Sequence, residues 1–293
     1  MAKAAGSGLK RYPRALLESF NSDIGAPRFE RAASLLPDVT AHDLAALWLG
    51  HAGTLLRVGG VTILTDPVLT DRIGPRFAGV TIGLPRLGPA PIAPADLPPI
   101  DLVLLSHAHF DHLDKPTLRA IASARTTVVT ARRTARLVPR GFGRVVELDW
   151  TEHLRFKGLD LSAIRPAHWG ARAALDRRRG YNSYLIRSDA GGVLFAGDTA
   201  YTDAFNHLPG VDLAVFGIGS YEPWEHAHAT PEQTWSMFRS IGGGAAGRLL
   251  PVHHSTFPMG DEPIGDPMRR LLAAAGAESH RVIQAAPGEL WTA

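Results

Sequence analysis

The chain has 293 residues, of which 45% are hydrophobic and 20% charged, and its formal net charge is only +3. It contains no cysteine, which excludes disulfides, thiolate metal sites and a cysteine nucleophile, so any metal site must use histidine and carboxylate ligands. The near-balanced charge gives no reason to expect a nucleic-acid partner, and no apolar run approaches the ~18 residues that span a bilayer. We therefore expect a cytoplasmic protein.

Residues 1–42 are expected to form a loosely structured arm with one short helix, ahead of a domain that fills residues 43–293. The arm lacks the apolar core and cleavage site of a secretory signal. Its basic residues Lys10, Arg11 and Arg14 lie beside the apolar residues of 16–20, a combination typical of helices that touch a membrane surface. A peripheral membrane contact is therefore kept as an alternative to a fully cytoplasmic location.

Short apolar runs follow the arm and predict strands over 44–51, 54–58 and 61–67. The Gly59-Gly60 pair between the last two is typical of a hairpin turn. Residues 73–99 differ in composition, because they are rich in proline and glycine yet contain Phe77, Ile82 and Leu87. So long an irregular segment is either an ordered loop over a site or a mobile linker, and its apolar residues favour the ordered loop.

Strand and helix patterns alternate after residue 100. Apolar runs predict strands within 101–106, 126–130, 144–148, 159–165, 182–188, 192–197, 212–218 and 248–254. Helices are predicted over 115–124, with Asp114 as N-cap, and over 230–241, where Thr230 and Gln233 form a capping box. A third helix is predicted over 266–276. The pattern favours two packed sheets with helices outside them.

The densest group of metal-ligand residues is the run HAHFDH, which comes directly after the predicted strand of residues 101–106. His107 and His109 are two residues apart at a strand end and therefore point to the same side. Asp111 and His112 follow where the chain turns towards the next helix. Imidazole and carboxylate together suit zinc, iron or manganese, so two neighbouring metal positions are predicted.

Further ligand residues follow other predicted strands. His168 comes after 159–165, Asp198 directly after 192–197, and His253 and His254 end 248–254. A single residue of this kind is often a buried histidine or a helix cap. Their shared position at the carboxyl ends of apolar strands is where α/β proteins build their sites.

These motifs resemble the metallo-β-lactamase superfamily, from about Ala46 to about His254. The resemblance implies an α+β fold, an αββα sandwich of two mixed sheets with helices on the outer faces. It also implies two divalent metal ions, expected to be Zn²⁺ with Mn²⁺ or Fe²⁺ as alternatives. One ion would be held by His107, His109 and His168, and the other by Asp111, His112 and His253. Asp198 would bridge the two ions, and Asp66 in LTDP would brace the site from behind.

Within the superfamily, the segments LGHAGTLLRVGGVTILTDP, PAHWGAR, FAGDTAY, GSYEP and HATPEQT resemble the N-acyl-phosphatidylethanolamine-hydrolysing phospholipases D. They are more distantly similar to the L-ascorbate 6-phosphate lactonases. One departure is GYNSY at 180–184, where the phospholipases have a Trp-Gly-Ser element. Because this tryptophan is missing, the resemblance does not predict the shape of the substrate pocket.

The resemblance implies a phosphodiesterase that uses a metal-bridging hydroxide, with Asp111, Asp198 and His228 as its catalytic residues. The substrate would be a small-molecule or lipid phosphodiester. Substrate-contact or supporting roles are assigned to His51, Tyr221 and Glu222. Trp169 and His226 are weighed as further contacts, against packing and surface roles. The alternatives are a lactonase or other carbonyl-ester hydrolase, a ribonuclease, a mononuclear-iron dioxygenase or thioesterase, and an inactive binding module.

Overall fold

The computed structural model describes residues 37–172, 176, 178–244 and 247–293. Most of the expected arm of residues 1–42, including its basic and apolar membrane-contact residues, lies outside this described part. The described chain begins with a 3-10 turn, Val39–Ala41, whose N-cap Asp38 accepts a hydrogen bond from the Thr40 amide. Val39 is buried against the first sheet, so the last residues of the arm pack onto the domain.

Within the described residues, the first sheet contains seven strands in the order β10-β9-β8-β3-β2-β1-β17. β3, β8, β9 and β10 are mutually parallel, whereas β3, β2, β1 and β17 alternate in direction. The Gly59-Gly60 turn joins β2 to β3, as predicted. The strand bounds are β1 Leu44–Trp48, β2 Thr54–Val58, β3 Val61–Thr65, β8 Leu102–Leu105, β9 Thr127–Ala131, β10 Arg144–Leu148 and β17 Leu290–Thr292.

The second sheet has six strands in the described part of the chain, in the order β11-β12-β13-β14-β15-β16. Its first four strands are antiparallel neighbours, and β14, β15 and β16 are parallel. The bounds are β11 His153–Phe156, β12 Leu159–Ile164, β13 Ser183–Ser188, β14 Gly191–Phe195, β15 Leu213–Gly217 and β16 Arg248–Val252.

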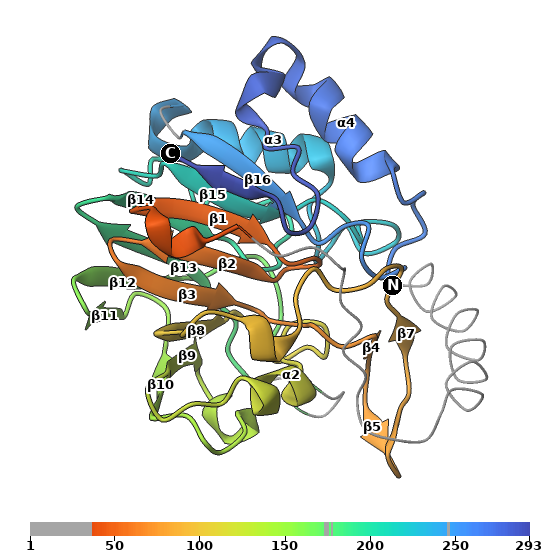
Figure 1. The fold of residues 1–293 in the computed structure, drawn as a ribbon. Coiled ribbons are helices and arrows are strands. Elements are labelled where there is room, and N and C mark those ends of the chain that lie inside the picture. Colours follow the sequence, from red (N-terminus) through yellow and green to blue (C-terminus); the bar gives the residue numbers. More distant parts are fainter. Residues whose placement is uncertain (1–36, 173–175, 177, 245–246) are drawn as a thin grey trace.

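The two sheets pack face to face, and helices cover their outer faces (Figure 1). α3 (Pro231–Ser240) and α4 (Asp266–Ala275) lie outside the second sheet, and α2 (Lys115–Ala120) lies outside the first. Short 3-10 turns occupy Pro94–Asp96, Ala135–Leu137, Ile241–Gly244 and Gly276–Arg281. The αββα sandwich implied by the sequence is confirmed. No helix in the described ranges has the length and apolarity to cross a membrane.

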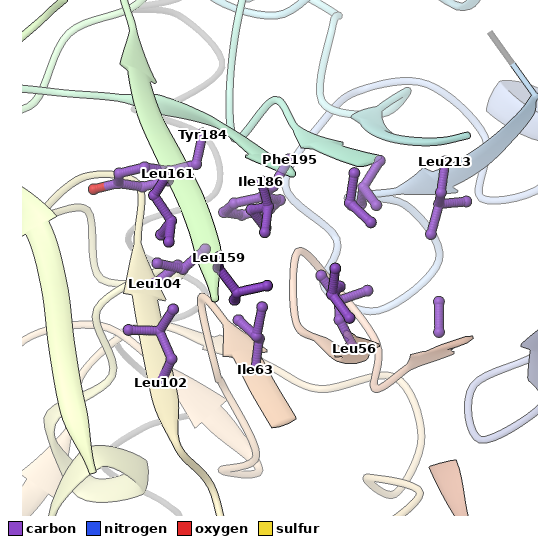
Figure 2. Packing of buried hydrophobic residues seen from close by; sticks show 14 of the residues in the cluster. Leu56, Ile63, Leu102, Leu104, Leu159, Leu161, Tyr184, Ile186, Phe195 and Leu213 are labelled. Carbon is purple, nitrogen blue, oxygen red and sulfur yellow. The ribbon is translucent and has the colours of Figure 1, made fainter. Parts of the chain in front are cut away.

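Alternation along the strands creates these layers. In β8, Leu102 and Leu104 point between the sheets, while Val103 and Leu105 face the α2 side. In β14, Phe195 points between the sheets and Leu194 points towards α3 and α4. Figure 2 shows the inner layer, where Ile63, Leu104, Leu159 and Phe195 from both sheets interdigitate. Burying both faces of a sheet requires nearly continuous apolar strands, which is how they read in the sequence.

The proline-rich segment forms local β-structure, although Phe77 and Leu87, two of its apolar residues, are 75% and 45% exposed. It forms two small ladders, one between β4 (Arg72–Ile73) and β7 (Leu84–Pro85) and one between β5 (Arg76–Phe77) and β6 (Val80–Thr81), which project from the sandwich (Figure 1). Arg86 anchors its base by donating to the carbonyls of Val68 and Leu49 at 2.8 Å each. Ile73 packs on Phe257, in the segment that follows His253.

Candidate metal centre

The topology carries the predicted ligands to one edge of the sandwich. β1, β3 and β8 run in one direction in the first sheet, and β12, β14 and β16 run in one direction in the second. Their carboxyl ends therefore meet, and each is followed by residues of the ligand type. In chain order these are His51, Asp66, the HAHFDH run, His168, Asp198 and His253.

A first ligand set consists of His107, His109, His168 and Asp198, each offering an atom within 4.8 Å of the others. The Nε2 of His107 lies 2.8 Å from Nδ1 of His109, and the Nε2 of His168 lies 3.4 Å from the same atom. Oδ2 of Asp198 is 3.7 Å from Nε2 of both His107 and His168.

A second ligand set consists of His51, Asp111, His112 and His253, under the same 4.8 Å limit. Oδ2 of Asp111 lies 3.2 Å from Nε2 of His112 and 3.3 Å from Nε2 of His253. Asp198 also faces this set, because its Oδ2 is 3.0 Å from Nε2 of His112 and its Oδ1 is 3.4 Å from Nε2 of His253. Asp198 therefore lies between the two sets.

The nitrogen and oxygen atoms of the two sets are better placed to bind two cations than to hydrogen-bond with one another. Nε2 of His112 and Oδ2 of Asp198 are buried and make no hydrogen bond of normal geometry in the described structure. Such orphaned atoms are rare in protein interiors and call for a missing partner. The His107 ring has its Nδ1 against the Ser106 hydroxyl at 2.8 Å, so its Nε2 lone pair is free to face inward. In both sets the ligand atoms point their lone pairs towards the interior of the cluster, an arrangement that suits divalent metal ions.

A supporting layer fixes the rings. Asp66 accepts from the Ser106 amide at 2.7 Å and from Nδ1 of His112 at 2.6 Å, and the Ser106 hydroxyl also contacts it. Nδ1 of His168 donates to the Ala227 carbonyl at 2.9 Å. His51 donates through Nε2 to Oδ2 of Asp111 at 2.8 Å. Hydrogen bonds of this kind set the tautomer and orientation of metal-binding imidazoles.

The backbone is strained at three of these positions. His51, Asp66 and His253 have φ values of 50°, 30° and 60°, in a region that side-chain-bearing residues rarely occupy. The His253 amide donates to the His51 carbonyl at 2.9 Å, which ties the two sheets together at this edge. Gly197 is needed for close approach, since a Cβ there would lie 2.8 Å from the Cβ of Ser106. Strain of this sort is commonly kept where it orients functional side chains.

The first set is built from neutral imidazoles. Burial lowers the pKa of His109 to about 3 and lowers the pKa of His107 and His168 from their ordinary value. Burial also lowers the pKa of His228, whose Nδ1 lies 3.9 Å from Oδ2 of Asp198. Neutral imidazoles have the free lone pair that metal binding requires.

The carboxylates are held ionised. Burial would raise the pKa of Asp111 and of Asp198, but the charge of neighbouring histidines, His112 above all, holds both well below the usual range, with hydrogen bonds from histidines adding to the effect on Asp111. Burial would lower the pKa of His112, but Asp198, Asp111 and Asp66 around it raise it well above normal.

Some of the remaining predicted residues join the cluster and others lie outside it. His228 joins Asp198 and His253 in a third group of metal-ligand type, and Asp66 groups with His107 and His112. His254 does not join the cluster; its ring stacks on Trp48 at 4.7 Å. Tyr221 and Glu222 are not brought to the cluster either. The Tyr221 hydroxyl donates to Asp266 of α4 at 2.6 Å, and Glu222 is exposed.

Two supporting residues escaped the sequence analysis, Ser106 and Arg172. The Arg172 guanidinium donates to the carbonyls of Ala108 and Leu113 at 3.0 and 2.8 Å, and it lies 4.0 Å from the centre of the Phe110 ring. It thus grips both ends of the HAHFDH run. Its place in the PAHWGAR motif was the available signal, but no spacing rule links it to residues some sixty positions earlier.

The comparisons with known proteins identify the family of this chain. Residues 61–254 match the model of a β-lactamase superfamily domain. An uncharacterized protein of Mycobacterium tuberculosis is 34% identical over 266 residues, covering 85% of this chain and 68% of its own. The N-acyl-phosphatidylethanolamine-hydrolyzing phospholipase D 1 of Caenorhabditis elegans is 29% identical over 296 residues, covering 89% of this chain and 81% of its own.

Among solved structures, a metallo hydrolase of the archaeon Ignicoccus hospitalis has the same fold. Its TM-score is 0.62 at 19% identity, over 85% of this chain and 97% of the archaeal one. The family match spans every predicted metal ligand from His107 to His253. The chain therefore belongs to the β-lactamase superfamily, in a branch of metal-dependent hydrolases that includes relatives of the N-acyl-phosphatidylethanolamine-hydrolysing phospholipases D.

Proposed function

We propose that this protein is a dinuclear metal-dependent phosphodiesterase of the N-acyl-phosphatidylethanolamine phospholipase D type. One ion is held by His107, His109 and His168, the other by Asp111, His112 and His253. The observation that carries the proposal is the position of Asp198, whose two carboxylate oxygens lie 3.0–3.7 Å from nitrogens of both ligand sets. A single carboxylate shared by two sets in this way suits a two-metal centre.

Because the proposed ligands are only histidines and aspartates, they favour zinc, with manganese or iron as alternatives. When bound, a pair of such ions supplies Lewis acidity and lowers the pKa of a coordinated water towards neutrality. Asp111 and Asp198, both held ionised, offset the charge of the ions. Asp66 and Ser106 hold the His112 and His107 rings in the tautomers that leave Nε2 directed inward.

His228 is suited to handle a proton at the leaving oxygen. The His228 side chain is 15% exposed, whereas those of Asp198, His107, His112, His168 and His253 are at most 2% exposed. His228 therefore lies on the open side of the centre. Its ring lies 5.1 Å from His253 and 5.4 Å from His168, between the two ligand sets. A positioned imidazole of this kind typically contributes ~10²–10⁴-fold to such reactions.

The phosphodiester chemistry is supported by relatives rather than by a bound substrate. The phospholipase D of C. elegans covers most of this chain, and the yeast N-acyl-phosphatidylethanolamine-hydrolyzing phospholipase D is 29% identical over 241 residues. Both are named for cleaving a phospholipid. By this likeness the substrate is a small-molecule or lipid phosphodiester.

The direct test is product analysis by mass spectrometry on N-acyl-phosphatidylethanolamine in mixed micelles, with zinc-loaded protein in ¹⁸O-labelled water. Phosphatidic acid that carries the label, together with N-acylethanolamine, is the expected result. Release of free fatty acid instead would mean that the site attacks carboxyl esters, which would overturn the phosphodiesterase in favour of the lactonase and ester-hydrolase class. Asp198→Asn protein, taken through the same zinc treatment, is the matched background control.

A further inference from the structure

A cavity of about 460 Å³ opens beside the first ligand set. His168, a proposed metal ligand, forms one part of its wall; because the His168 side chain is only 1% exposed, the cavity lies behind this ligand and not at the metal-facing atoms. Its other main lining residues are Arg165, Trp169, Tyr181, Thr202 and His226. None of these has a role in the proposed chemistry. The volume is in the range that accommodates a substituent of a small substrate.

Two aromatic side chains shape this cavity. Trp169 is 50% exposed and packs edge-on against the ring of His109 at 4.4 Å, so it stands between the cavity and the first ligand set. Tyr181 lies on another side, with its ring 5.2 Å from that of Trp150. Trp150 is itself fixed, because its indole N–H donates to the Tyr181 carbonyl at 2.7 Å.

The Arg165 side chain lies over the ring of Trp150. Its guanidinium carbon lies 4.4 Å from the centre of the Trp150 ring, a cation–π contact that orients the group without consuming its N–H donors. No carboxylate of the described residues forms an ion pair with Arg165, and none lines the cavity. The cavity therefore combines one oriented positive charge with two aromatic side chains, in a lining that also includes Thr202 and His226.

We propose that this cavity binds an anionic substituent of the substrate, a carboxylate or a phosphate, on the arm of the phosphodiester that is not the scissile ester. Arg165 donates to the anion, and Trp169 and Tyr181 flank the hydrocarbon next to it. The inference rests on the proposed phosphodiesterase and adds a preference: phosphodiesters with a second negative charge should be cleaved more efficiently than those without one. A quaternary ammonium group, which aromatic walls alone would accept, is repelled by Arg165.

The test compares three 4-nitrophenyl phosphodiesters that differ in the charge of the second arm. They are the 3-carboxypropyl ester, its uncharged isostere the butyl ester, and 4-nitrophenyl phosphorylcholine. With the zinc-loaded protein, we expect kcat/KM for the carboxypropyl ester to exceed that for the butyl ester about tenfold or more, with the choline ester slowest. The gain should appear mainly in KM, because the arm is remote from the reacting bonds.

Arg165→Met should remove the preference for the carboxypropyl ester and leave the butyl ester and the zinc content unchanged. The matched control is Arg155→Met, an exposed arginine on β11 that does not line the cavity; it should behave as wild type. Equal kcat/KM for the three esters, preference for the choline ester, or an unaltered preference in Arg165→Met would each overturn the proposal.

A binding measurement separates this proposal from the proposed function. Phenylacetate should quench tryptophan fluorescence of the zinc-loaded wild type and of Arg155→Met, since Trp169 lines the cavity, but not that of Arg165→Met. If none of the esters is cleaved by protein with two metals, the phosphodiesterase is wrong, and the fluorescence titration then decides the anion site alone. Absence of Arg165-dependent quenching in that case would overturn the anion site as well.

Discussion

Asp198 illustrates how one residue serves both halves of the candidate centre. It follows β14 directly, and Gly197 before it permits the close packing on Ser106 that brings its carboxylate inward. The neighbouring histidines outweigh its burial, so its pKa stays well below the usual range and the carboxylate remains charged in the interior. A buried charge of this kind is stable only with compensating positive charge, which ties Asp198 to metal binding.

Replacing Asp198 by asparagine should remove this shared charge while keeping the size of the side chain. We expect Asp198→Asn to fold, to lose at least one metal ion per chain by elemental analysis, and to lose most of the phosphodiesterase activity. Asp203→Asn, an exposed position in the same loop, serves as the control. Near wild-type turnover by Asp198→Asn would refute the bridging role.

His228 offers a contrasting prediction, because it lies beside the ligands without completing either set. His228→Ala should retain both metal ions and lose activity by about 10²–10⁴-fold in kcat. The exposed His207→Ala should lose neither. A metal content below that of the wild type would show that His228 is a ligand and that the proton-handling role is mistaken.

Arg172 is expected to act through the ligands it positions. Arg172→Met should leave the Ala108 and Leu113 carbonyls without their donor, loosen the HAHFDH run and weaken metal binding. The visible spectrum of the cobalt-substituted protein reports ligand geometry directly and should change. Arg172→Lys should restore it only in part, since an ammonium lacks the planar group that lies over the Phe110 ring while one of its nitrogens donates to both carbonyls. A spectrum like that of Arg119→Met, an exposed arginine on α2, would argue against positioning by Arg172.

At the scale of elements, the sequence predicted best where local signals were dense. The apolar runs, the Gly59-Gly60 turn, Asp114 as N-cap of α2 and the capping box of α3 are all confirmed. β11 and β17 were missed, because β11 alternates polar and apolar residues at a sheet edge and β17 has only three residues. The grouping of the seven ligands followed from strand ends and from the resemblance, although their role as ligands stays a prediction.

Contacts between distant segments were beyond the sequence. Tyr221 follows β15 and was expected near the site, yet its hydroxyl is bound by Asp266, a residue of α4 whose docking no local pattern predicts. The cavity lined by Arg165 and Trp169 likewise combines residues from three separate loops. Sequence spacing has no information about which of these loops pack together, since that depends on how the two sheets are stacked.

The capping box gives a prediction at this scale. Thr230 accepts from the Gln233 amide, and the Gln233 side chain accepts from the Thr230 amide at 3.0 Å. Thr230→Ala leaves an unpaired amide at the start of α3 and should lower the free energy of unfolding by about 1 kcal/mol in urea titrations. Ser236→Ala, exposed in the middle of α3, should be neutral or slightly stabilising; an equal loss in both variants would exclude the cap as the cause.

For the whole molecule, the proposed metal centre would act as a cross-link between two sheets. The HAHFDH run follows β8 of the first sheet, whereas His168, Asp198 and His253 follow strands of the second. The core between the sheets is apolar and independent of the ions. Metal binding should therefore add stability to a fold that can form without it, unlike small domains whose folding depends on a metal.

Metal removal tests this directly. After dialysis against a chelator, far-ultraviolet circular dichroism should keep its sheet signal while Tm falls by about 5–10 °C, and zinc should restore it. Such a drop corresponds to about 4 kcal/mol, the linkage expected when the free ion is ~1,000-fold above its Kd. An unchanged Tm in protein shown to release its metal would mean that the ligands do not connect the two sheets.

The pairing of β1 with β17 has a consequence for how the protein is made. β1 precedes the other strands of the described chain, and within the described residues its outer edge is covered by residues 290–292. Until these residues are synthesised, the unpaired backbone of Leu44–Trp48, apolar on both faces, is a template for pairing with another nascent chain. Expression yield and chaperone dependence should accordingly be governed by the last few residues of the described chain, far from any chemistry.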